Sequence, residues 1–118
     1  MSTENTTAIE AFVQQQIACW NQGDKEAFMA AYRNIATDKL IIEYVGKPEA
    51  DGWPILEGMW AQSQTKIEVE EVLIIAAGDE VACHNKNKIR GTDQVIETVE
   101  LYKLSSGCLS IRYFIKMP

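Results

Sequence analysis

The sequence lacks any long hydrophobic segment. No apolar run approaches the ~20 residues that a membrane-spanning helix needs. The first residues, Met1–Thr7, are polar and do not provide the apolar region of a signal peptide. Neither a membrane span nor a secretory leader is therefore expected, and the sequence predicts a cytoplasmic protein.

Cysteine and histidine are scarce. The three cysteines, Cys19, Cys83 and Cys108, are odd in number and are not spaced as metal ligands, so we expect reduced, buried thiols. His84 is the only histidine, and one histidine among scattered carboxylates is poor support for zinc. The chain has no Ser–His–Asp order and no glycine-rich phosphate loop, so we expect no metal and no cofactor.

Basic residues are in the minority. Lys and Arg number 11 against 17 Asp and Glu, which gives a formal net charge of −6 and a pI near 4.7. Nucleic acids and anionic membranes favour basic patches, so neither partner is expected. The chain does have 118 residues with 47% hydrophobic content. That is enough for a core, and we expect residues 1–118 to form one domain.

The first apolar pattern of the chain predicts a long amphipathic helix. Hydrophobic residues recur at helical spacing from Ile9 to Trp20, and the stripe contains one polar member, Gln16. Gly23 can take the left-handed conformation that ends a helix. Asp24 is a good N-cap for the next one, so two helices are expected to meet here.

The rest of the first half predicts two helices and a short strand. The second helix carries Phe28 and Tyr32 on one side, and a strand is expected over 40–44. Pro54 suits the first turn of a third helix, whose apolar side includes Trp60.

The second half predicts antiparallel strands. Runs rich in β-branched and aromatic residues are separated by turn signals at 78–79, 91–93 and 105–107. They predict strands over residues 66–75, 81–90, 95–104 and 108–117. Helices followed by a run of strands indicate an α+β fold, with the helices packed on one face of a bent sheet.

The last hairpin sets the predicted site. If Leu104 pairs with Cys108 across the turn at 105–107, Glu100 faces Arg112. A carboxylate and a guanidinium would then lie among apolar neighbours on one face, which we expect to consist of Ile96, Thr98, Glu100, Tyr102, Leu104, Ser110, Arg112 and Phe114.

Several short features support a family resemblance. They are the joint Trp20–Asp24, which reads Trp-Asn-Gln-Gly-Asp, Gly52 ahead of the third helix, the Gly91-Thr92 turn and the Gly107 hairpin. Through them nearly the whole chain resembles the nuclear-transport-factor-2-like superfamily, in its SnoaL-like and ketosteroid-isomerase-like branch. The resemblance implies a cone-shaped α+β barrel: three N-terminal helices on a strongly curved, mostly antiparallel sheet, with a pocket at the open end. Members include isomerases, cyclases, epoxide hydrolases and many proteins of no known activity.

The resemblance implies catalytic roles for three residues. Glu43 takes the place of the Asp general base of ketosteroid isomerases. Glu100 takes the place of their second acid, which donates a hydrogen bond to an oxyanion. Arg112, if it lies opposite, would favour the ionised form of Glu100 and make a Glu–Arg pair, with or without chemistry, at the pocket centre. Limonene epoxide hydrolase-like proteins offer a less favoured alternative, in which Thr98, Glu100 and Arg112 would hold a water.

The resemblance also places the ligand-binding candidates. Gln16 takes the place of a tyrosine donor in the isomerases, and an amide is a weaker oxyanion stabiliser than a phenol. In the strand over 81–90, parity groups His84 with lysines on an outward face, so we expect it to be non-catalytic. The inward candidates are Gln16, Tyr32, Trp60, Asn85, Asn87, Tyr102 and Phe114.

These observations predict a small-molecule-binding protein with a pocket inside the cone. It would take a small apolar or partly polar ligand, and could be an isomerase- or cyclase-type enzyme using acid–base carboxylates. The alternative is a non-catalytic ligand-binding or dimerisation domain. The resemblance implies a homodimer through the outer sheet face. An apolar patch there would otherwise need an explanation, and we expect it to contain Val95, Val99, Leu101, Ile111, Tyr113 and Ile115.

Overall fold

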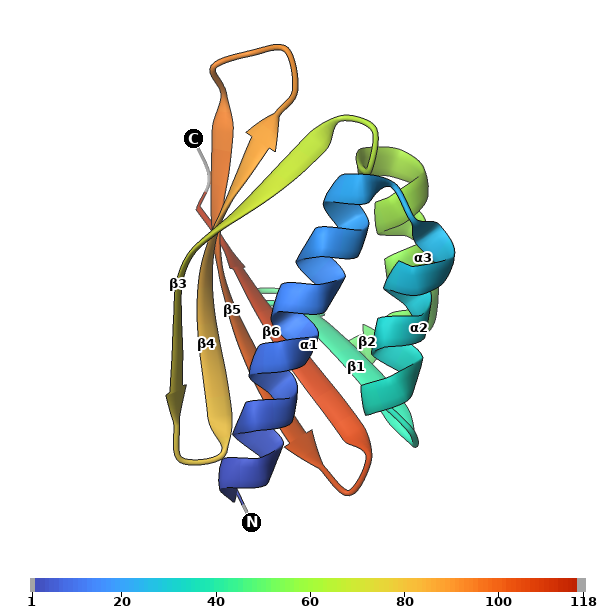
Figure 1. Cartoon of the computed structure of the whole chain (residues 1–118), viewed down its shortest axis with the longest axis vertical. Coiled ribbons are helices and arrows are strands. Elements are labelled where there is room, and N and C mark those ends of the chain that lie inside the picture. Colours follow the sequence, from blue (N-terminus) through green and yellow to red (C-terminus); the bar gives the residue numbers. More distant parts are fainter. Residues whose placement is uncertain (1, 117–118) are drawn as a thin grey trace.

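The computed structural model describes residues 2–116 and the side chains of residues 5–116. Three helices are followed by most of a six-stranded sheet, and in Figure 1 the helices lie together on one side of it. The helices are α1 (Ser2–Gln22), α2 (Lys25–Ile35) and α3 (Gly52–Ser63). The expected α+β class with three helices is confirmed. Among the described residues, no helix is both long and apolar enough to cross a membrane.

The joint between the first two helices follows the local signals. Gly23 has φ +75°, a conformation that glycine adopts without steric cost. The Oδ1 atom of Asp24 accepts a hydrogen bond from the Ala27 amide at 3.1 Å, so Asp24 is the N-cap of α2. The stripe of α1 is buried through Ile9, Val13 and Trp20, and both predictions are therefore confirmed.

The sheet is mixed but mostly antiparallel. Its strands lie in the order β2-β1-β6-β5-β4-β3, and only the β1–β6 pair is parallel. Their bounds are β1 (Lys39–Tyr44), β2 (Ala50–Asp51), β3 (Ile67–Ala77), β4 (Glu80–Ile89), β5 (Val95–Ser105) and β6 (Cys108–Ile115). The two-residue β2 was not predicted. Of the predicted last strand, Met117 lies outside the described residues.

The register of the last hairpin differs from the predicted one. Ser105 pairs with Cys108, so the turn contains two residues, Ser106 and Gly107, with φ +51° and +76°. Two positive φ values are typical of the type I′ turn, whose twist suits a two-residue hairpin. The prediction assumed a three-residue turn. A shift of one residue moves every side chain of one strand to the other face, so the predicted Glu100–Arg112 pairing is wrong.

The faces of β6 are consequently reversed. Ile111 and Tyr113 were predicted to point outward and are buried, whereas Arg112 and Phe114 were predicted to point inward and are exposed. Glu100 pairs with Tyr113 across the sheet. The face predicted for β5 is correct, because Thr98, Glu100 and Tyr102 are all buried.

The faces of β4 are as predicted. Val81, Cys83 and Asn85 are buried and face the helices, and His84 and Lys86 lie on the opposite face. All three cysteines are free thiols, and Cys108 is only partly buried. The inner face therefore combines an apolar core with a few polar side chains, and these define the site described next.

Candidate functional site

A cavity of about 300 Å³ lies between the helices and the inner face of the sheet. Most of its wall is apolar or aromatic, and its polar members gather on β4 and β5. The apolar and aromatic lining consists of Ile17, Trp20, Phe28, Tyr32, Tyr44, Met59, Ile67, Val69, Ile96, Tyr113 and Ile115. The polar lining consists of Gln16, Ser63, Asn85, Asn87, Thr98 and Glu100.

Glu100 is the carboxyl group of this cavity. Only 6% of the residue is exposed. Its Oε1 atom accepts a hydrogen bond from the Tyr102 hydroxyl at 2.5 Å. Its Oε2 atom accepts from the Thr98 hydroxyl at 2.9 Å and the Asn85 amide at 3.1 Å. Three neutral donors therefore hold the carboxyl group in one orientation.

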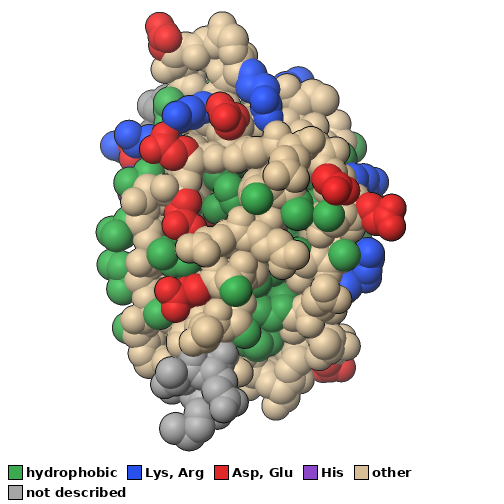
Figure 2. All heavy atoms as spheres, in the orientation of Figure 1, with side chains coloured by type: hydrophobic (Ala, Val, Ile, Leu, Met, Phe, Trp, Pro, Cys, Tyr) green, Lys and Arg blue, Asp and Glu red, His purple; other side chains and the backbone are tan. Residues whose placement is uncertain are grey.

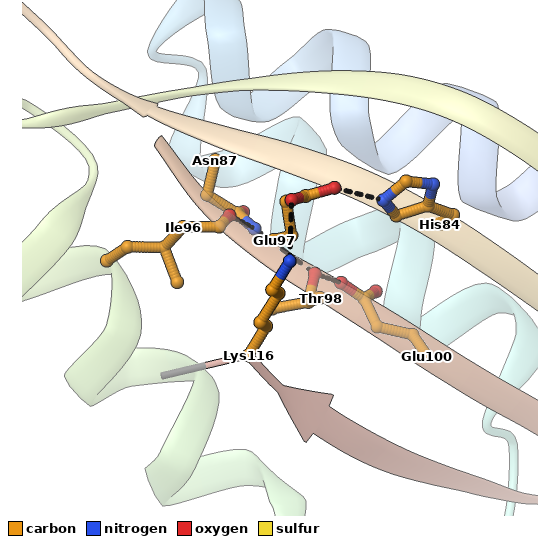
Figure 3. Close-up of polar contacts among 7 residues, drawn as sticks. All are labelled: His84, Asn87, Ile96, Glu97, Thr98, Glu100 and Lys116. Carbon is orange, nitrogen blue, oxygen red and sulfur yellow. Dashed lines mark hydrogen bonds and ion pairs between the residues drawn. The ribbon is translucent and has the colours of Figure 1, made fainter. Parts of the chain in front are cut away.

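Two of these donors are themselves oriented by neighbours. The Asn87 Nδ2 donates to the Thr98 hydroxyl at 3.1 Å, which leaves the hydroxyl hydrogen free to point at Glu100. Figure 3 shows this line of contacts from Asn87 through Thr98 to Glu100. The Cys83 thiol donates to the Asn85 Oδ1 at 3.1 Å, so the amide nitrogen of Asn85 faces Glu100.

Burial controls the proton affinity of Glu100. Desolvation raises the pKa of Glu100, and the hydrogen bonds from Tyr102, Thr98 and Asn85 offset only part of that effect. Of the described residues that line the cavity, none is Lys, Arg or His. A charged Glu100 therefore has no cationic partner in the cavity wall.

The tyrosines around the cavity are neutral hydrogen-bonding groups. Tyr32 donates to the Gln16 Oε1 at 3.5 Å, and Tyr113 is hydrogen-bonded to Tyr32. Tyr44 stacks on Tyr113 with ring centroids 5.4 Å apart. Burial, with a smaller effect of Glu100, raises the pKa of Tyr32 and Tyr44. These phenols can donate hydrogen bonds to a ligand without ionising.

Glu100 also affects the thiol of Cys83, which is hydrogen-bonded to Asn85. Burial first and Glu100 second raise the pKa of Cys83 to about 12. The thiol therefore stays protonated and acts as a donor, not as a nucleophile. Among the described residues, no cluster of three or more His, Cys, Asp or Glu side chains could hold a metal ion. The side chains of this site can transfer a proton and can donate and accept hydrogen bonds.

Most of the predicted inward residues meet at this cavity. Gln16, Tyr32, Asn85, Asn87 and Glu100 all line it. Tyr102 is fully buried and is bonded to Glu100, but it does not itself line the cavity. Trp60 instead packs against Trp20 and Phe28, with ring centroids 5.4 and 5.1 Å apart.

Three predicted site residues lie on the outer face of the sheet. The Arg112 Nε atom pairs with the Glu43 Oε1 at 3.2 Å, and the Arg112 guanidinium lies 5.3 Å from the Phe114 ring centroid. Glu43 follows Leu40 and Ile42, which are buried, so alternation along β1 turns Glu43 away from the cavity. The predicted placement of Glu43, Arg112 and Phe114 in the pocket is wrong.

The prediction missed four aromatic residues of the cavity: Trp20 and Phe28 on the helices, and Tyr44 and Tyr113 on the strands. A two-residue turn at 106–107 would have placed Tyr113 on the inner face. The burial of Leu40 and Ile42 implies that Tyr44, two residues further on, also faces inward. Strand parity was therefore the signal for Tyr44 and Tyr113, once the turn and the inner face of β1 are fixed.

A second polar cluster lies on the other face of β5. The His84 Nε2 atom is 2.9 Å from the Glu97 Oε1, and the Lys116 Nζ is 3.8 Å from the Glu97 Oε2. These residues border a groove of about 250 Å³ that also includes Val99, Phe114 and Ile115. Figure 3 shows Glu97 and Glu100 projecting in different directions from the same strand.

Comparisons with known proteins identify the fold. No family model matches the chain, and no curated protein matches it in sequence. Solved structures match over most of its length at low identity. One is a Kribbella flavida protein with the provisional name ketosteroid isomerase (TM-score 0.72, 14% identity, 98% of this chain and 80% of that one).

Two further structures agree with it. One is an NTF-2 like protein of unknown function from Burkholderia xenovorans (TM-score 0.72, 16% identity, 95% of this chain and 85% of that one). The other, from Jannaschia, has the provisional name SnoaL-like polyketide cyclase (TM-score 0.64, 16% identity, 89% of this chain and 85% of that one). At these identities the likeness concerns the fold alone. The chain has the cone-shaped fold of nuclear-transport-factor-2-like proteins, which SnoaL-like and ketosteroid-isomerase-like structures share.

Proposed function

We propose that the protein binds a small molecule in the cone and exchanges a proton with it through Glu100. The observation that carries this proposal is the burial of Glu100 in the wall of a mostly apolar cavity, oriented by three hydrogen-bond donors. A desolvated carboxyl group with a raised pKa is suited to proton transfer near neutral pH.

The reaction class that fits is isomerase- or cyclase-type acid–base chemistry. The ionised carboxylate would remove a proton next to a carbonyl group. A neutral phenol, Tyr32 or Tyr113, would donate a hydrogen bond to the oxygen that gains charge, in exchange for its present bond to Gln16 or Tyr32. Glu43 and Arg112 take no part, since both lie outside the cavity. The proposal therefore depends on Glu100 alone as the proton-transfer group.

The test measures proton removal without knowledge of the substrate. The protein is mixed with 2-tetralone, a compact ketone with exchangeable α-protons, and NMR follows their replacement by deuterium in D₂O. Wild type should accelerate the exchange, and Glu100→Gln should abolish the acceleration. The matched control is Glu97→Gln, which removes a carboxylate from the outer face of the same strand and should leave the rate unchanged. Equal acceleration by wild type and Glu100→Gln would refute the role of Glu100.

Non-catalytic binding is the alternative function, and one contact favours it. Gln16 stands on α1 where the isomerases have a tyrosine donor. Its Oε1 atom accepts the hydrogen bond of Tyr32, so the hydroxyl hydrogen of Tyr32 already has an acceptor within the protein. Saturable binding of 2-tetralone with no accelerated exchange would select this alternative.

We also propose that the protein is a homodimer through the outer face of the sheet. Register places Leu73, Val99 and Phe114 in one row across β3, β5 and β6, with His84 between them on β4, and 53%, 40% and 39% of the three hydrophobic residues are exposed. The helices cover the other face (Figure 1), and hydrophobic side chains gather along the left edge of Figure 2, where β3 lies. An apolar row of this kind needs a cover. Residues of both charge signs border the row, Glu97 beside Lys116 for example, so the same face of a second copy can match it.

Light scattering tests the dimer. Wild type at micromolar concentration should give twice the chain mass, and Phe114→Glu should give the chain mass. A wild-type protein that scatters as a monomer at this concentration would exclude the assembly.

A further inference from the structure

We propose that the ligand of the cavity is a small organic amine, with its ammonium group paired to Glu100 and its body against the aromatic wall. This inference rests on the proposed function, because it names the ligand class of the same cavity. It depends on two features of the described residues: the hydrogen bonds that Glu100 accepts, and the groups that surround the empty space beside it.

The hydrogen bonds around Glu100 suit its ionised form. Tyr102, Thr98 and Asn85 all donate to it. Further hydrogen bonds set the donor direction of Thr98 and Asn85. Asn87 donates to the Thr98 hydroxyl oxygen, and Cys83 donates to the Asn85 side-chain oxygen. The carboxyl group thus receives three neutral donors and acts only as an acceptor, the state of a carboxylate.

The charge of that carboxylate has no counterpart in the cavity. None of the described lining residues carries a positive charge. Three glutamates elsewhere in the sheet have cationic partners: Glu97 with Lys116, Glu70 with Lys88, and Glu43 with Arg112. A buried charge without a partner is costly, and a cation that enters the cavity supplies the partner.

The remaining wall suits the body of an organic cation. Five aromatic side chains line the cavity: Trp20, Phe28, Tyr32, Tyr44 and Tyr113. Aromatic faces attract ammonium groups, more strongly where water is excluded. The net charge of −6 favours the approach of cations over anions. A cavity of about 300 Å³ is at the small end of ligand sites, which suits one ring with a short aminoalkyl chain.

Proton transfer gives the same ion pair from neutral partners. If the Glu100 carboxyl group carries its proton and the amine enters uncharged, the carboxyl O–H bond breaks and an N–H bond forms on the amine. The products are a carboxylate and an ammonium ion, and no other reactant is needed.

A series of ligands that differ in charge and little in shape tests the inference. Isothermal titration calorimetry at pH 7.5 would compare 2-phenylethylamine, which is cationic, with 2-phenylethanol, which is neutral, and 3-phenylpropanoate, which is anionic. We expect the amine to bind about ten-fold more tightly than the alcohol, because the bond to Glu100 becomes charge-assisted, and the anion to bind least. An alcohol that binds as tightly as the amine would overturn the inference.

Two variants assign the preference to Glu100. Glu100→Gln keeps the side-chain size and removes the charge, so the amine and alcohol affinities should fall within about two-fold of each other. Glu97→Gln changes the net charge equally and should preserve the wild-type preference. Should Glu100→Gln fail to fold, Tyr44→Leu replaces it: Tyr44 is half-buried at the cavity, and its loss should weaken the amine more than the alcohol. An unchanged ratio in Tyr44→Leu would contradict the aromatic contribution and overturn the proposed binding mode.

The outcomes separate this inference from the proposed function. Binding of 2-phenylethanol, or Glu100-dependent exchange of 2-tetralone, without a preference for the amine leaves the proposed function in place and removes the amine. A preference for the amine that persists in Glu100→Gln removes the Glu100–ammonium pair, because the charge recognised would then lie elsewhere, and the exchange of 2-tetralone decides the proposed function separately.

Discussion

Glu97 and Glu100 are three residues apart on β5 and have opposite surroundings. Glu97 lies on the outer face, where its hydrogen bond with His84 is the main cause of its lowered pKa. Glu100 lies on the inner face, where burial is the main cause of its raised pKa. Both are visible in Figure 3. The side of the sheet, set by the parity of one strand, decides whether a carboxylate is part of an ordinary surface ion pair or of a candidate site.

The difference also shows what a site requires beyond a charged residue. Glu97 is partly exposed and has Lys116 and His84 as side-chain partners, so its charge is satisfied without a ligand. Glu100 has hydrogen-bond donors and, among the described lining residues, no cation, so its charge is oriented without being neutralised. A group of the second kind can still gain from a ligand.

The largest expected effect separates the two faces at adjacent positions of β6. Tyr113→Glu places a charge in the interior, where Tyr113 is 9% exposed. It should lower the free energy of unfolding by about 3–5 kcal/mol, since none of the cavity-lining residues that the structure describes is a cation that could pair with it. Phe114→Glu places the same charge on the outer face and should lower it by less than about 1 kcal/mol.

Urea unfolding of both variants at sub-micromolar concentration, where a dimer contributes least, measures this difference. A Tyr113→Phe variant is the control for loss of the hydroxyl group alone. Equal destabilisation by the two glutamates would contradict the register of the β5–β6 hairpin.

That register also marks the limit of what the sequence could predict. Apolar periodicity was sufficient for α1, since Ile9, Val13 and Trp20 are buried as expected. The alternation of side chains was sufficient for β4, where Asn85 lies on the inner face and His84 on the outer face, as predicted. Both predictions depend on one element at a time, where the spacing of side chains is fixed by local geometry.

The errors occur where two elements must be placed relative to each other. The turn at Ser106-Gly107 needs a non-glycine residue with positive φ, which the sequence does not reveal because Ser105 could equally belong to the turn. The parallel pairing of β1 with β6, which brings Glu43 beside Arg112, joins segments almost 70 residues apart. Pairings at that range depend on the packing of the whole sheet, and no local pattern determines them.

A smaller effect concerns the pH dependence of stability. Because the pKa of Glu100 is raised by folding, the folded state binds more protons than the unfolded state above the ordinary glutamate pKa of 4.5. The contribution of Glu100 to the free energy of unfolding is therefore fully present below pH 4.5. It is lost as the pH rises through the raised pKa of the folded state. Glu100→Gln should remove this loss, so its stability relative to wild type should increase with pH.

Glu97→Gln should show the opposite sign. The pKa of Glu97 is lowered, so its contribution is present above pH 4.5 and is lost as the pH falls below it. Urea midpoints between pH 3 and pH 8 would give both trends. In Glu100→Gln the amide oxygen can accept from Thr98 and Asn85 and the amide nitrogen can donate to the Tyr102 oxygen, so the network can be kept. Parallel trends in the two variants would contradict the contrast between the faces.

The smallest expected effect concerns Arg112, which the sequence placed in a buried pair. Loss of one partner of such a pair would cost ~3–5 kcal/mol. In the structure the side chain of Arg112 is 47% exposed and that of Glu43 is 26% exposed, so Arg112→Met should cost less than about 1 kcal/mol. Lys25→Met is a matched control, because Lys25 and Glu57 form a similarly exposed pair on the helices.

A double-mutant cycle of Glu43→Gln and Arg112→Met in urea should give a coupling energy below about 1 kcal/mol. Coupling of Arg112 to Glu100 instead would show that β6 is turned the other way, with its guanidinium in the cavity and the charge of Glu100 already neutralised.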